Sequence, residues 1–149
     1  MQPEITPGII ALDTMGSDLG AGEVIEGVSI LLKENPDASG IILVGDRAQI
    51  ERELKKHHLY GDHRVTVYHA TQVIGMDEKP VSAIKRGKDS SLVRAIELVK
   101  EQKAKAVISC GNTGALMAGG TIKLRPLDGI ERPALACVMP NRDGHFVLC

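Results

Sequence analysis

Six short runs of apolar residues are spaced along the 149-residue chain, and each has the length of a β-strand. Apolar runs of this kind, bounded by turn residues, predict strands that are covered on both faces. They lie at residues 9–12, 41–44, 65–69, 106–109, 133–139 and 145–149. Asn141 and Gly144 delimit a turn between the last two runs.

Helical patterns lie between these runs. Apolar residues recur at intervals of three and four after the first strand, and Asp46 with Gln49 forms a capping box after the second. The predicted helices cover residues 24–32, 46–57 and 80–86, and two more begin at cap residues 89–91 and 112–113. Because strands alternate with helices, the sequence predicts βαβ units and an α/β fold with a largely parallel sheet.

Composition narrows the class of protein. Apolar residues make up 43% of the chain and aromatic residues only 2%, so the core must be aliphatic. The net charge of −1 and the scarcity of aromatic side chains argue against nucleic-acid binding, and no apolar run is long enough to span a bilayer. The three cysteines show neither disulfide nor zinc spacing, and no secretion signal is present. These features predict a cytoplasmic protein of one domain.

The most informative segment is 106–117, where a strand leads through Gly111, Asn112, Thr113 and Gly114 into a helix. In α/β folds the N–H groups exposed at such a helix start hold anions, and the helix dipole assists them. An ordinary N-cap with glycines for the turn explains the same residues equally well. The segment matches neither a Walker loop nor the G-x-G-x-x-G of a dinucleotide fold.

A second candidate site is the loop that carries Asp13, Gly16 and Asp18. Asp13 follows the first strand, at the sheet edge where open α/β sheets bind ligands, and Gly16 lets the backbone approach a ligand closely. The alternative is a turn rich in aspartate and glycine that bonds to itself. Two carboxylates in one loop do not make a magnesium site, so no metal is predicted.

A third candidate is the cluster formed by Lys85, Arg86, Ser90 and Ser91. Cations beside a helix start suit an anion, and the two hydroxyls could donate hydrogen bonds to it. A solvated helix end is the commoner meaning of such a cluster, and the pattern alone favours it.

Cys110 ends a strand before a glycine, as the nucleophile does in an α/β-hydrolase. The G-x-S-x-G frame is absent, because Ile108 and Asn112 occupy its glycine positions. We therefore expect Cys110 to be a buried packing residue. The histidines show no metal-ligand spacing, and His69 is expected to be a hydrogen-bonded structural residue.

Five motifs, taken in order, resemble those of the bacterial phosphate acyltransferases, the PlsX family of phospholipid synthesis. They are D-T-M-G-S-D at 13–18, K-P-V-S-A-I at 79–84, K-D-S-S-L at 88–92, S-C-G-N-T-G-A-L-M at 109–117 and G-I-E-R-P-A-L at 129–135. Two departures stand out: Ser17 replaces a glycine, and Cys110 stands where the family commonly has alanine. The second departure counts against a covalent cysteine mechanism.

The resemblance implies a three-layer α/β/α fold, shared with phosphate acetyltransferases and with isocitrate and isopropylmalate dehydrogenases. It implies transfer of a long-chain acyl group from acyl carrier protein to inorganic phosphate, without a cofactor, by a cytosolic homodimer that associates peripherally with the membrane. Members of the family are more than twice this long. The last apolar run would also need cover on both faces as a parallel strand. We therefore expect residues 1–149 to be the N-terminal part of a phosphate acyltransferase domain.

The resulting hypothesis is direct attack of phosphate on the thioester carbonyl, with no acyl-enzyme. Asn112 and Thr113 would hold the phosphate or the developing oxyanion. Further roles in orienting phosphate or shaping the cleft fall to Asp13, Asp18, Lys85, Arg86, Ser90 and Ser91. The alternatives are a nucleotide-dependent dehydrogenase of the same broad fold, for which the sequence holds no dinucleotide fingerprint, and a non-catalytic phosphate-binding fragment.

Overall fold

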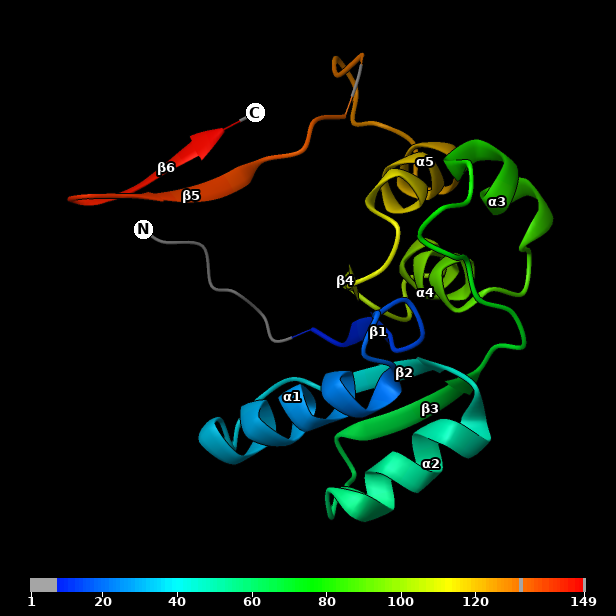
Figure 1. The fold of residues 1–149 in the computed structure, drawn as a ribbon, viewed down its shortest axis with the longest axis vertical. Helices are drawn as coiled ribbons and strands as arrows, with labels where there is room; N and C mark the ends of the chain where they lie inside the picture. Colours follow the sequence, from blue (N-terminus) through cyan, green and yellow to red (C-terminus); the bar gives the residue numbers. More distant parts are fainter. Residues whose placement is uncertain (1–7, 132, 149) are drawn as a thin grey trace.

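A parallel four-stranded sheet organises the computed structural model, which describes residues 8–131 and 133–148. Its strands are β1 (Ile10–Asp13), β2 (Ile41–Gly45), β3 (Val65–His69) and β4 (Ala106–Ser109). They lie in the order β3-β2-β1-β4, and every neighbouring pair is parallel (Figure 1). The prediction of an α/β fold with a parallel sheet is confirmed for these four strands.

Helices cover both faces of this sheet. The five helices are α1 (Ala21–Glu34), α2 (Arg47–Lys56), α3 (Pro80–Arg86), α4 (Ser91–Lys100) and α5 (Thr113–Lys123). The first two pack on one face, α4 packs on the other, and α3 and α5 lie against α4 (Figure 1). The arrangement is the expected three-layer α/β/α fold.

The core is aliphatic, as the composition requires. Successive residues of a strand point to opposite faces of the sheet. Leu12 accordingly packs with the α1 and α2 side, whereas Ala11 packs with the α4 side. Ile25 and Ile96, which lie in α1 and α4, are both fully buried. A strand buried on both faces needs apolar side chains at consecutive positions, which explains its continuous apolar run.

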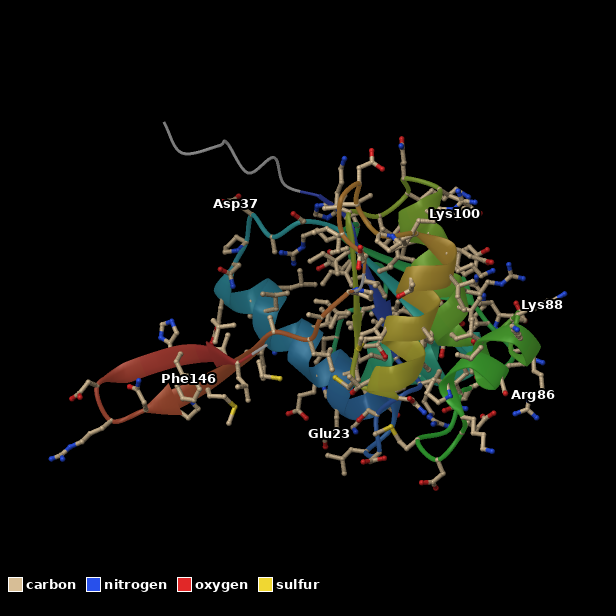
Figure 2. The ribbon with its side chains drawn as sticks, turned by 90° about the horizontal axis from the view of Figure 1, so that it is seen from above. Glu23, Asp37, Arg86, Lys88, Lys100 and Phe146 are labelled. Carbon is tan, nitrogen blue, oxygen red and sulfur yellow. The ribbon has the colours of Figure 1, made fainter. Side chains whose placement is uncertain are left out.

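The last two strands form a unit of their own. Strands β5 (Cys137–Asn141) and β6 (Gly144–Leu148) pair with each other as an antiparallel hairpin. The hairpin projects away from the helices, with Phe146 on it, and its side chains are exposed (Figure 2). The predicted turn between Asn141 and Gly144 is confirmed. A place for these strands in the parallel sheet was the wrong prediction, because so short a connection allows only antiparallel pairing.

None of the helices that the structure describes combines the length and apolar character needed to cross a bilayer.

Candidate functional site

The carboxyl ends of β1 and β4 meet at one edge of the sheet, where Asp13 pairs in register with Ser109. The Ser109 hydroxyl donates to Oδ2 of Asp13 at 2.8 Å, and the backbone N–H of Met15 donates to Oδ1 at 3.1 Å. Asp13 is only 2% exposed. The structure therefore places Asp13 at the predicted edge, but its carboxylate joins two strands and does not line an open cleft.

The loops after these two strands touch through their glycines. A Cβ on Gly16 would lie 2.7 Å from Cα of Gly111 and 3.0 Å from Oδ2 of Asp13. A separation under 3.0 Å is not available to a side chain, so position 16 requires glycine, and a Cβ on Gly111 would be in tight contact with Cα of Gly16 at 3.0 Å. Asp18, further along the first loop, is exposed, and it makes no hydrogen bond to a residue within 8–131 or 133–148. Gly16 and Gly111 thus bring the two predicted loops together, and Asp18 stays outside their contact.

Asn112, one of the two cap candidates in the sequence, is the N-cap of α5. Its Oδ1 accepts the N–H of Ala115 at 2.9 Å. Its Nδ2 lies 3.0–3.1 Å from three backbone carbonyl oxygens of the preceding connector, at Gly75, Met76 and Glu78. An amide nitrogen has two hydrogens, so these carbonyls already use its whole donor capacity. The side chain of Asn112, 8% exposed, therefore shapes the site and has no donor left for a ligand.

The donors that do remain at the start of α5 belong to the backbone. An α-helix leaves its first N–H groups without intrahelical partners. In α5 Ala115 bonds to the side chain of Asn112 and Leu116 to its carbonyl, whereas the N–H groups of Thr113 and Gly114 have no acceptor among the described residues. Thr113 is also exposed. Pro80 packs against Gly114, where a Cβ would lie 2.7 Å from Cγ of the proline.

The serines of the third candidate are buried. Ser90 is 0% exposed and caps α4, with its hydroxyl accepting the N–H of Val93 at 3.3 Å. Ser91 is 1% exposed, and its N–H donates to the carbonyl of Gln72 at 3.0 Å. The segment around Gln72 therefore closes the start of α4 against solvent.

Asp89 holds the connector at Thr71 against the start of α4. Thr71 donates to it from both its backbone N–H and its hydroxyl, and Nε of Arg94 donates at 2.8 Å. The hydrogen bonds from Thr71, followed by that from Arg94, lower the pKa of Asp89 to about 2. A charged Asp89 therefore holds the connector onto α4 at neutral pH.

Lys85, one cation of the third candidate, lies apart from the α5 N-terminus. Lys85 lines a hollow together with Lys123, the last residue of α5. Because α5 has 11 residues and a helix rises 1.5 Å per residue, that end lies about 15 Å from Thr113. Arg86 is exposed and pairs with Oε2 of Glu78 at 3.0 Å. The structure does not bring Lys85 to the predicted anion site.

The prediction that Cys110 is buried is wrong. The residue is exposed rather than buried, because β4 is the edge strand of the four-stranded sheet and leaves its α1-side neighbour Ile108 48% exposed as well. Both residues line an apolar hollow beside α1. His69, in contrast, accepts the N–H of Arg47 at its Nδ1, so its structural role is confirmed. The described residues contain no group of three or more histidine, cysteine, aspartate or glutamate side chains that could hold a metal ion.

Two parts of this site were not predicted from the sequence. Ser109 was not singled out, although a hydroxyl at the end of one apolar run, like the carboxylate of Asp13 at the end of another, is a usable signal. The carbonyl groups of residues 75–78 could not have been found, because side-chain patterns say nothing about where a connector presents its backbone.

The family profile described as "Fatty acid synthesis protein" matches residues 9–149. The chain belongs to this fatty acid synthesis protein family. It is 47% identical over 135 residues to the phosphate acyltransferase of Chromobacterium violaceum, covering 91% of this chain and 39% of that protein. It is 45% identical over 140 residues to the phosphate acyltransferase of Clostridium kluyveri, covering 94% and 41%.

A further relative is the phosphate acyltransferase of Neisseria meningitidis, 43% identical over 139 residues, or 93% of this chain and 39% of that protein. The chain thus spans about two fifths of the length of these curated relatives. The family recognised from the five motifs is confirmed. The matched region of the fatty acid synthesis protein family includes the β1 and β4 edge and the start of α5.

Proposed function

We propose that this chain forms the N-terminal part of a phosphate acyltransferase domain, which transfers a fatty acyl group from acyl carrier protein to inorganic phosphate. The observation that carries the proposal is the pair of N–H groups of Thr113 and Gly114, which have no acceptor among the described residues, in a chain similar to relatives named phosphate acyltransferase. An anion at this point meets two backbone donors, the Thr113 hydroxyl and the positive end of α5.

The chemistry follows from this geometry. One phosphate oxygen attacks the thioester carbonyl, the new C–O bond forms, and the C–S bond breaks. The thiolate that leaves takes up a proton, and acyl phosphate is the product. Phosphate is already nucleophilic at neutral pH, so the work of the site is to position it and to stabilise the oxyanion that develops on the carbonyl. No cofactor is needed for this reaction.

Asn112 has a positioning role in the proposal. Its contacts hold the connector at residues 75–78 against α5, which sets where Thr113 and Gly114 present their donors. Asp13 and Ser109 hold the facing strand ends in the same way. We therefore propose that the backbone N–H groups of Thr113 and Gly114, and not the side chain of Asn112, hold the phosphate.

The partners proposed for the protein are acyl carrier protein, inorganic phosphate and a second subunit in a homodimer. We also propose a cytoplasmic location with peripheral membrane association. The support for these points is the family resemblance carried by the five motifs, together with the names of the relatives.

The function is tested by incubating the chain with acyl–acyl carrier protein and ³²P-labelled phosphate, and by measuring labelled acyl phosphate. Cys110→Ala should keep the single-turnover rate of the unmodified chain, because phosphate attacks the thioester directly. A trapped acyl-cysteine in the unmodified protein, together with loss of transfer in the variant, would replace direct attack by a covalent mechanism. Phosphate binding without any acyl phosphate would support the non-catalytic alternative.

A further inference from the structure

A hollow of about 460 Å³ lies among α3, α4 and α5, away from the start of α5. Four cationic side chains line it, Lys85, Lys88, Arg94 and Lys123, with a single carboxylate, that of Glu97. The whole chain carries a net charge of −1, so this gathering of positive charge is local. Figure 2 shows Lys88 at the margin of the molecule, on the loop that joins α3 to α4.

Two of the four cations are already neutralised. Arg94 donates to Glu97 at 3.1 Å and to Asp89 at 2.8 Å, and Lys123 donates to Glu97 at 2.7 Å. Lys85 and Lys88 make no ion pair with any residue that the structure describes. The hollow therefore presents the ammonium groups of Lys85 and Lys88, which have no ion-pair partner among the described residues, beside two cations that already form ion pairs.

These properties fit a particular kind of ligand. A small anion is best bound by convergent donors or a free guanidinium fork, and the guanidinium of Arg94 is already occupied. Lysine ammonium groups are separate point charges on flexible stems, which suit carboxylates spread over a surface. Ile84 and Ile122 add apolar walls, and Ile122 is 48% exposed. A recessed site of this kind suits a protruding protein element better than a flat membrane surface.

We propose that this hollow docks a carboxylate-rich face of the protein that carries the acyl group. The inference rests on the proposed function for the identity of that carrier. Lys85 and Lys88 contact the carboxylates directly, whereas Arg94 and Lys123 keep the wall of the hollow in place through Glu97. Electrostatic docking of this type sets partner choice and association rate.

The position of the hollow adds a geometric requirement. Lys123 and Thr113 are the two ends of α5, about 15 Å apart. A carrier seated on the hollow must therefore present its thioester on an arm of about that length. Docking and chemistry then use opposite ends of one helix, which allows the two to be disabled separately.

The test is the affinity of the chain for acyl carrier protein, measured by fluorescence anisotropy at several salt concentrations. Lys85→Glu/Lys88→Glu should weaken binding about tenfold or more and flatten its salt dependence. Lys85→Gln/Lys88→Gln should give an intermediate loss. The matched control, Lys33→Glu/Lys56→Glu, makes the same change in net charge on α1 and α2, at the other face of the sheet, and should bind as the unmodified chain does. Circular dichroism melts check that each variant is folded.

An equal loss in the two glutamate pairs, or no loss in either, would overturn the proposal. So would loss of binding to phosphatidylglycerol vesicles in Lys85→Glu/Lys88→Glu with carrier binding intact, since it would assign the hollow to lipid. Failure of the proposed function is a separate outcome: carrier binding would depend on Lys85 and Lys88, yet no acyl phosphate would form from any acyl thioester, including one without a carrier.

Discussion

The starts of α4 and α5 look alike in sequence and differ in what they leave open. Each has a polar cap, Ser90 or Asn112, followed by a hydroxyl residue, Ser91 or Thr113. At α4 the connector around Gln72 accepts the first N–H, and Ser91 is buried. At α5 Thr113 is exposed, and two N–H groups have no acceptor among the residues in the described ranges.

The difference lies in where the preceding connector bonds. Residues 71 and 72 bond along the start of α4 and cover it. Residues 75–78 instead turn their carbonyls onto the side chain of Asn112, which leaves the backbone of the next two residues uncovered. At α5 the neighbouring chain thus bonds to the cap side chain and leaves the N–H groups of Thr113 and Gly114 open, which makes this helix start the candidate anion site.

The largest effect is expected from removing one donor of α5. Thr113→Pro deletes both the N–H and the hydroxyl, and proline is well accepted at the first position of a helix. Asn112 has φ −58° and ψ 104°, an extended conformation that a following proline allows. Loss of such a donor should lower the rate of acyl phosphate formation by about 10²–10³.

Two controls sharpen this result. Thr113→Val removes the hydroxyl and keeps the N–H, so it should retain more activity than Thr113→Pro. Ser90→Ala makes the matched change at α4, where it should cost about 1 kcal/mol of stability and leave the rate unchanged. Equal rates for Thr113→Pro and Thr113→Val would remove the backbone donor from the mechanism.

Asn112→Ala should destabilise the protein by about 2 kcal/mol, because it removes an N-cap and leaves the part-buried carbonyl groups of Gly75, Met76 and Glu78 without their donor. The measurement is the free energy of unfolding from urea titration. Thr113→Ala, at the exposed neighbouring position, should change that free energy by less than about 0.5 kcal/mol. Similar stabilities for the two variants would show that Asn112 does not hold the connector.

The smallest expected effect is on the stability of the fold at acidic pH. The pKa of Asp89 is lowered to about 2 in the folded protein, from an ordinary value of 3.8. The charged carboxylate therefore stabilises the fold above about pH 4, and this stabilisation is lost as the pH falls towards 2. Asp89→Asn should cost about 1 kcal/mol at pH 7, since the group is partly exposed, and this cost should shrink as the pH falls from about 4 through 2. A stability difference that does not depend on pH would contradict the assigned cause.

Local patterns in the sequence predicted much of the fold. Apolar runs located β1 to β4, and the caps at Asp46, Ser90 and Asn112 were each recognisable from a short polar motif. The exposed position of Cys110 was not predictable, because it depends on β4 being an edge strand, and strand order arises from contacts between distant segments.

The site was only partly predictable for the same reason. Gly16 and Gly111 were expected near a ligand, yet their backbones contact each other closely across 95 residues of chain. The grouping of Lys85 with Ser90 came from closeness in sequence. In the structure Lys85 lies with Lys123 in the hollow among α3, α4 and α5. Ser90 is instead buried as the N-cap of α4.

The central claim is that phosphate binds at the open start of α5 and not at the closed start of α4. The most direct measurement is a titration of the ¹⁵N-labelled chain with inorganic phosphate, followed by the backbone amide shifts in two-dimensional NMR spectra. We expect saturable shifts concentrated at Thr113 and Gly114, with Ser91 and Val93 unmoved. Shifts centred on Ser91 and Val93, or spread evenly over the lysines, would contradict it.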